Sequence, residues 1–284
     1  MKKLFLLLLP ASLILSCVDN NQNLNDLEYK NLKGKVKSFE IKRYWAKTSF
    51  GELKREHLTE KIISEFNTEG NFTEQSKYST KTNNLKDEVL LDFKWIYKYN
   101  EDGKFSERNT FNADGEITEK IILKYNTDGN RTEESTFDAE GKLERKIKHQ
   151  YNEDGIKTES SFYYAEGNLE QLLKFDDNGN LMELNNYDSN GQLNYRVKSQ
   201  YDNNENLTEQ SWYYADGELK EDIKLQYDKH RNETEISYYK SDGELDIKYN
   251  YQYEYDRENN WILKTSYAND TVQEIIEREI EYYE

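Results

Sequence analysis

The stretch Tyr125-Asn126-Thr127-Asp128-Gly129-Asn130 decides the fold, because variants of it recur along most of the chain. Eleven of the 13 glycines follow Asp, Glu or Asn, and an aromatic residue lies four positions before each of these eleven. Three further copies lack the glycine but keep the Tyr-Asp pair, at Tyr201, Tyr227 and Tyr255. Asp-Gly and Asn-Gly between alternating segments predict β-hairpin turns, since glycine accepts the positive φ that such turns require.

The spacing of these turns predicts a sheet. From Gly103 onward successive turns are 12 or 14 residues apart, with 16 at the last step, so the unit is a 26-residue double hairpin with one 24-residue copy. Every spacing is even, and side chains on a strand alternate between the two faces with period two. We therefore expect each copy to present the same face to the same environment.

The two parities of the repeat differ in polarity. One carries Leu219, Ile223 and Leu225, whereas the other carries charged or amide side chains such as Lys220 and Lys224. The sequence thus predicts an all-β fold, a repetitive antiparallel meander with one apolar and one solvated face. About 15 strands follow from the count, more than open twisted sheets usually hold. We therefore expect a coiled single-layer sheet: a shell, a superhelical strip or an open barrel-like wrap.

The N-terminus resembles the signal and lipobox of bacterial lipoproteins. A short basic start precedes an apolar run over 4–15, and Ile14-Leu15-Ser16-Cys17 places the only cysteine after a small residue. The run is too short to span a bilayer permanently. We expect a lipoprotein signal peptide over 1–16, lipid attachment at Cys17 and a polar tether over 17–31. Residues 32–98 are expected to form an irregular β capping region, and residues 99–284 the repeat array.

The composition excludes several classes of protein. The formal net charge of −17 argues against a nucleic-acid partner, which needs a basic face. One cysteine excludes a disulfide framework. Leu, Ile, Val and Phe are scarce, which by itself suggests disorder, but 24 tyrosines and a single proline indicate the opposite.

The Tyr-Asn/Asp-x-Asp-Gly-Asn pattern resembles the YD repeat of the Rhs family over roughly residues 66–267. Leu32-Lys33-Gly34-Lys35-Val36 is similar to the opening of small Bacteroidota-type lipoproteins with such repeats. The resemblance implies a spiralling β-sheet. The chain is too short to enclose a toxin domain as large Rhs proteins do, and it shows no self-cleaving protease motif.

No convergent catalytic or metal-binding set emerges from the sequence. His57, His149 and His230 are isolated, which argues against zinc. His149 lies between Ile147 and Tyr151 on the apolar parity, so we expect a packed, hydrogen-bonded ring. We expect no cofactor, no metal and no enzymatic activity.

One group of aromatic residues on the polar parity is not explained by folding. Phe162 and Trp212 occupy equivalent positions 50 residues apart, and the repeat would align them. A row of rings is typical of a stacking platform for sugars or a peptide, although Tyr and Trp are also common in ordinary strands. The candidate ligand-stacking residues are Phe162, Tyr164, Trp212, Tyr214 and Tyr238.

These observations favour a non-enzymatic protein of the cell envelope. It would be lipid-anchored in the membrane, most simply the outer membrane, and would present a repetitive β surface to an unknown protein or glycan partner. The alternatives are a glycan- or cell-wall-binding module that uses the aromatic row, and a toxin-associated companion of the Rhs or immunity type.

Overall fold

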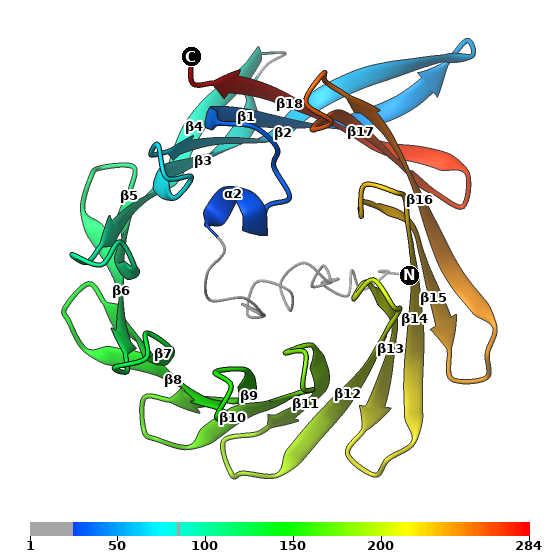
Figure 1. Cartoon of the computed structure of the whole chain (residues 1–284). Helices are drawn as coiled ribbons and strands as arrows, with labels where there is room; N and C mark the ends of the chain where they lie inside the picture. Colours follow the sequence, from blue (N-terminus) through cyan, green and yellow to red (C-terminus); the bar gives the residue numbers. More distant parts are fainter. Residues whose placement is uncertain (1–24, 84–85) are drawn as a thin grey trace.

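The protein is a closed β-barrel in the computed structural model, which describes residues 25–83 and 86–284 (Figure 1). Its 18 strands form one antiparallel sheet in which each strand pairs with the next along the chain. The first strand pairs with the second and also with the last, so the ring is complete. A short helix lies inside the ring in this view.

The elements follow one another with short turns between most of them. They are α2 (Asp26–Tyr29), β1 (Val36–Ser49), β2 (Glu52–Phe66), β3 (Phe72–Asn83), β4 (Lys86–Tyr99), β5 (Phe105–Asn112), β6 (Ile117–Tyr125), β7 (Arg131–Asp138), β8 (Leu143–Tyr151), β9 (Lys157–Tyr164), β10 (Leu169–Phe175), β11 (Leu181–Tyr187), β12 (Leu193–Tyr201), β13 (Leu207–Tyr214), β14 (Leu219–Tyr227), β15 (Glu233–Lys240), β16 (Leu245–Tyr255), β17 (Trp261–Ala268) and β18 (Thr271–Tyr282).

The predicted all-β, coiled meander is confirmed, and the coil closes on itself. The four strands over Val36–Tyr99 belong to the same sheet as the regular repeats, and β1 joins the two ends of the array. Closure removes the unpaired edges that an open strip would expose. With strands about 4.8 Å apart and tilted by about 40°, 18 strands enclose a ring about 35 Å across.

The turns explain the recurrent motif. Asn126 Oδ1 accepts hydrogen bonds from the backbone N–H groups of Asp128, at 3.1 Å, and Asn130, at 2.8 Å. Gly129 takes φ 84°, and the pairing of β6 with β7 shifts by one residue beside the turn, as in a hairpin whose bulge carries the glycine. The three copies without glycine keep the same backbone, with positive φ at Glu205, Arg231 and Asn259.

The register corrects the expected assignment of faces. Directly opposed residues in an antiparallel pair share a face, and here Ile147 lies opposite Phe162 and Val197 opposite Trp212. Along the repeats from β4 to β17, the regular pairs therefore join an odd position to an even one, because each turn with its bulge switches the parity between consecutive strands. Beyond them the register differs, and Lys264 of β17 lies opposite Ile276 of β18. Phe162 and Trp212 lie on the same face as the apolar residues and not on the polar face.

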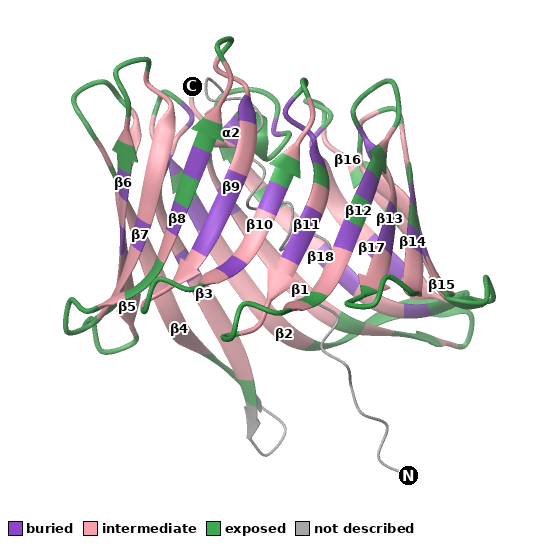
Figure 2. Ribbon diagram, turned by 90° about the horizontal axis from the view of Figure 1, so that it is seen from below, coloured by how far each residue is buried: buried purple, intermediate pink, exposed green. Residues whose placement is uncertain are grey.

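The apolar face lines the interior of the barrel. The helix α2 lies inside the ring, and its Leu27 packs with Phe39, Phe66 and Phe72 of the wall (Figure 1). Two further clusters of buried residues follow along the strands from β8 to β15. Buried positions fall mainly in the middle of strands, and exposed ones at the two rims (Figure 2).

The segment expected as a polar tether ends in ordered structure. Asn25 and Glu28 form a capping box at the start of α2. The Leu27 N–H donates to the carbonyl of Gly70 at 3.0 Å, and the Leu27 side chain is buried. The part of the predicted tether from Asn25 onward is therefore docked against the wall, because it carries an apolar side chain that the barrel can bury.

Candidate functional site

The repeated tyrosine serves the architecture. The hydroxyl of Tyr125 donates to the carbonyl of Phe105 at 2.5 Å, and that of Tyr151 donates to the carbonyl of Arg131 at 2.6 Å. The Tyr201 hydroxyl makes the same contact two strand pairs further on, since the copy between them carries Phe175. Each bond joins the last residue of one strand to the first residue of the preceding strand. The motif is therefore explained by folding, and a functional site has to be sought elsewhere on the wall.

The five predicted stacking residues all face inward but do not form one exposed row. Phe162 is only 5% exposed and packs with Ile147. Trp212 is half-buried and stacks on Tyr195, with ring centroids 5.3 Å apart. Tyr164 is also half-buried. The inward turn of these rings follows from the parity switch described above.

Two of the five rings lie near other features of the wall. Tyr238 meets Tyr249 edge to face with centroids 6.0 Å apart. Tyr214 is 50% exposed at the end of β13 and borders a cleft of about 270 Å³, which Tyr213, Arg196 and Lys198 of the outer face also line. Among the predicted residues, Tyr214 is thus the ring that solvent or a ligand reaches most readily.

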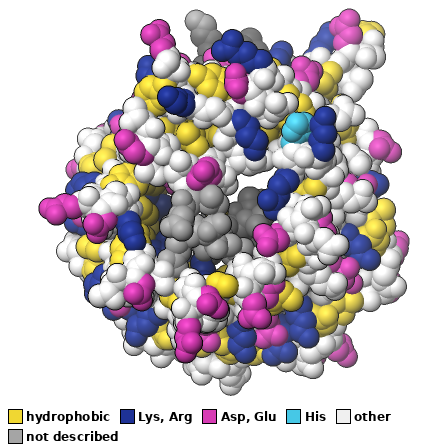
Figure 3. Space-filling view, in the orientation of Figure 1, with side chains coloured by type: hydrophobic (Ala, Val, Ile, Leu, Met, Phe, Trp, Pro, Cys, Tyr) yellow, Lys and Arg dark blue, Asp and Glu magenta, His cyan; other side chains and the backbone are white. Residues whose placement is uncertain are grey.

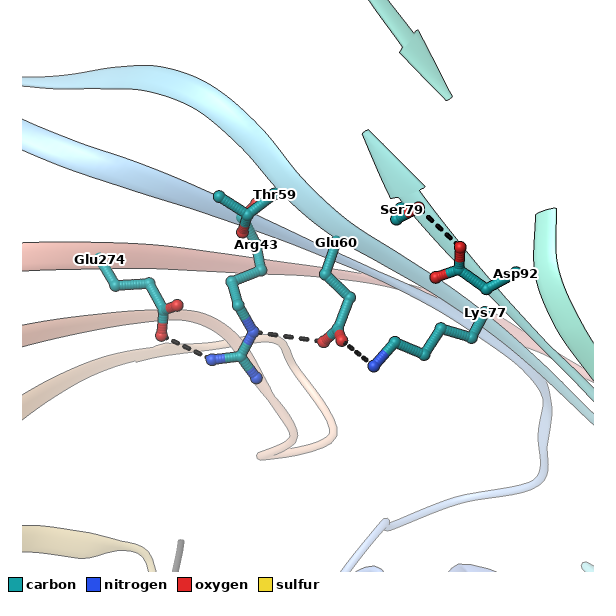
Figure 4. A network of polar contacts seen from close by, with 7 residues as sticks. All are labelled: Arg43, Thr59, Glu60, Lys77, Ser79, Asp92 and Glu274. Carbon is teal, nitrogen blue, oxygen red and sulfur yellow. Dashed lines mark hydrogen bonds and ion pairs between the residues drawn. The ribbon is translucent and has the colours of Figure 1, made fainter. Parts of the chain in front are cut away.

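A chain of four charged side chains crosses four adjacent strands on the interior face (Figure 4). Glu274 of β18 lies 2.6 Å from Arg43 of β1, which lies 3.3 Å from Glu60 of β2, and the Nζ of Lys77 on β3 lies 2.6 Å from Glu60. Burial raises the pKa of Glu60, but Lys77 and Arg43 outweigh it and hold that pKa below its usual value. The four positions lie 17 to 231 residues apart, so no spacing in the sequence groups them.

Two cations beside these four charged side chains have no carboxylate partner among the described residues. Lys264 of β17 places its Nζ 4.0 Å from the ring centroid of Tyr251 and 5.5 Å from that of Tyr253. Arg278 of β18 places its Cζ 3.4 Å from the ring centroid of Trp261, and its Nε is buried without a hydrogen-bond partner. Burial lowers the pKa of Lys264, and it lowers the pKa of Arg278 to about 9.

The outer face carries charges that pair across strands. Glu107 contacts Lys98 at 2.6 Å and Lys120 at 2.9 Å, and Glu133 bridges two lysines in the same way. Burial raises the pKa of Glu107, but hydrogen bonds from the two lysines outweigh it and lower that pKa to about 2. Acidic and basic side chains are interspersed over the face seen along the barrel axis (Figure 3). The outer surface of a barrel that faces lipid carries an apolar band, which differs from the paired charges on this outer face.

His149 is packed as expected. It is 8% exposed, and its Nδ1 lies 2.8 Å from the Oγ of Ser160 on the neighbouring strand. Within residues 25–83 and 86–284, no group of three or more His, Cys, Asp or Glu side chains is placed to hold a metal ion. No helix in the described part of the chain is both long and apolar enough to cross a membrane. Cys17 lies outside the described residues.

Comparisons with known proteins give no family. No family model matches the chain, and no curated protein matches it. Among solved structures, a porin-like protein from Bacteroides uniformis is 9% identical, with 88% of this chain and 99% of that chain covered and a TM-score of 0.47. A porin-like protein from Bacteroides vulgatus is 12% identical, with coverages of 88% and 99% and a TM-score of 0.32.

The Tc holotoxin pore of Photorhabdus luminescens is a third neighbour. It is 11% identical, with 80% of this chain but only 18% of that chain covered and a TM-score of 0.23. All three TM-scores are low, so these neighbours carry no argument about what the chain binds. The function has to be argued from the wall itself.

Proposed function

We propose that this chain is a non-enzymatic protein of the cell envelope whose binding surface is the interior of the barrel. The observation that carries the proposal is the difference between the two faces. Outside, carboxylates such as Glu107 and Glu133 each contact two lysines. Inside, the wall holds rings such as Tyr214 together with the unpaired cations Lys264 and Arg278.

The two faces differ in the charges and aromatic rings that they leave available to a partner. Exposed ion pairs contribute little to stability, but they neutralise one another and offer a partner few free charges. Aromatic rings with polar groups on a concave wall are the usual composition of a ligand site. An 18-stranded ring is also wide enough to admit a ligand between its walls.

A glycan is the ligand class that the rings near Tyr214 favour, because sugars stack on Tyr and Trp. We expect a glycan array to give a hit that Tyr214→Ala abolishes. Tyr239→Ala is the matched control, because Tyr239 lies opposite Asp222 on the outer face and does not line this cleft. Absence of any hit, or equal loss with Tyr239→Ala, would contradict the glycan assignment.

The envelope location is tested separately from ligand binding. We propose that Cys17 carries lipid and that the protein is held on the outer membrane. Cys17→Ser should then abolish labelling by an alkyne fatty acid and move the protein into the soluble fraction. Labelling that persists in Cys17→Ser would contradict lipid attachment at this residue. The alternative of a toxin-associated companion stays a prediction, which the identity of neighbouring genes tests.

A further inference from the structure

Three cations surround one buried residue of the interior wall, and they lie on the adjacent strands β17, β18 and β1. Ile276 of β18 is 7% exposed and lies opposite Lys264 of β17 on one side and Arg43 of β1 on the other. Arg278 is two residues further along β18 and so shares the inward face. Diagonal neighbours on adjacent strands lie about 7–8 Å apart, within reach of long side chains.

The three cations differ in how they are balanced. Arg43 contacts both Glu274 and Glu60. Lys264 and Arg278 make no ion pair with any described residue, and each instead lies over aromatic rings. Cation–π contacts offset part of the cost of removing a cation from water, but they do not supply the counter-charge that a carboxylate would.

The repeat itself does not require a cation at this position. Lys264 lies opposite Tyr253, two residues before the aromatic residue of its turn. The equivalent places on other strands, read from the same register, hold Leu184, Gln210 and Ile236, and also Ser160, Glu134 and Arg108. An aliphatic or amide side chain therefore fits this part of the wall. Arg108 is a cation at the equivalent place, but it pairs with Glu119, whereas Lys264 has no acidic partner among the described residues.

The net charge of the whole protein makes the two unpaired interior cations unusual. The protein carries a formal net charge of −17, yet it leaves two interior cations without an acidic partner in its described part. Burial and the neighbouring Arg43 lower the pKa of Lys264, although Glu233 and Glu274 act in the opposite direction. An anion that entered the barrel would meet both cations on one wall and restore the balance of charge.

We propose that Lys264 and Arg278, with Arg43 beside them, form a binding site for the oxyanion group, phosphate or carboxylate, of a ligand held in the barrel. The proposal rests on the proposed function of the interior as a binding surface. Arg278 supplies N–H donors, among them the unpartnered Nε, and Lys264 supplies an ammonium group that rotates to meet an oxygen.

The experiment uses residues 17–284 with Cys17→Ser, which retains every described residue. Isothermal titration calorimetry is run with inorganic phosphate, with glucuronate, and with glucose as the uncharged control. We expect dissociation constants in the millimolar range or tighter for at least one oxyanion and no heat from glucose. Binding of phosphate alone indicates a phosphate ligand, and binding of glucuronate alone indicates a carboxylate ligand.

Variants then locate the site. Lys264→Gln and Arg278→Gln should each weaken binding at least about tenfold, because each removes one of the two unpaired charges. Lys248→Gln is the matched control, since it removes the same charge on the outer face, where Lys248 pairs with Glu235. Lys264→Arg keeps the charge and should retain most of the affinity. Circular dichroism of each variant checks that the barrel has formed.

Two results would overturn the proposal. One is a folded parent protein that binds neither phosphate nor glucuronate. The other is a loss of affinity with Lys248→Gln that equals the loss with Lys264→Gln. Either result would mean that Lys264 and Arg278 only pack against the aromatic rings and bind no anion. A glycan array without hits, together with oxyanion binding that Lys264→Gln removes, would count against the sugar assignment alone and leave this site standing.

Discussion

Acidification should destabilise the barrel through His149. Burial lowers the pKa of this imidazole to about 3, and the positive charges of Arg131 and Lys157 lower it further in the same direction. In the unfolded chain the pKa of histidine is about 6.5. Between this pKa and that of the folded protein, the unfolded state therefore binds a proton that the folded state does not bind. The contribution to stability is therefore complete above pH 6.5 and is lost progressively as the pH falls from 6.5 toward 3. Between pH 7 and pH 5 the loss amounts to about 2 kcal/mol.

Urea unfolding at half-unit steps from pH 7.5 to 5 measures this loss, and His149→Gln is the comparison. Carboxylates with lowered pKa values, such as Glu107 and Glu133, lose their contribution mainly below this range. The free energy of unfolding of the parent should fall by about 2 kcal/mol more than that of the variant over this interval. Parallel curves for the two proteins would refute the reasoning and would mean that the ring is protonated in the folded barrel.

Three further substitutions probe turns and the repeated hydrogen bond. Phe50 is 101% exposed at a turn with φ 54°, so Phe50→Asn should raise the stability by about 1 kcal/mol in thermal unfolding, and a decrease would contradict this. Gly70 and Gly103 both have positive φ, but only at Gly70 would a Cβ meet α2, at 2.8 Å from the Asn25 side chain. Gly70→Ala should therefore destabilise the protein by at least about 1 kcal/mol more than Gly103→Ala in urea, and equal losses would mean that α2 is not docked there. Tyr125→Phe removes the hydroxyl bonded to a backbone carbonyl and should cost about 1 kcal/mol by the same measurement, whereas no loss would leave the recurrence of this tyrosine unexplained.

The repeat predicted the fold well because its signal is local. Asp128-Gly129 and its copies define the turns, and Glu205 at φ 62° keeps the same backbone where glycine is absent. Closure was not predictable in the same way. It depends on pairing between Phe39 and Ile280, which are 241 positions apart, and no periodicity reports such a contact.

The candidate site was harder to predict than the fold. Even spacing predicts Phe162 on the polar face if parity is preserved from strand to strand, whereas the bulge at each turn of the repeat switches the parity. The inward cations Lys264 and Arg278 come together only once β17, β18 and β1 are adjacent. Comparing the copies position by position would not have singled out Lys264, because the equivalent places on β5 and β7 carry Arg108 and Glu134. Arg108 pairs with Glu119, and the lack of such a partner for Lys264 is visible only in the folded barrel.

The pairing of β1 with β18 is the last one that can form as the barrel folds. Every other pairing joins neighbouring strands, so those hairpins can form as the chain is made, but this one waits for the last strand. Closing a loop of about 240 residues costs about 2.5 kcal/mol more chain entropy than closing a 14-residue hairpin. Until that moment β1 keeps an open edge able to pair with another chain. Pairing of residues 271–282 with β1 should therefore be the step that separates a closed ring from an open strip prone to aggregation.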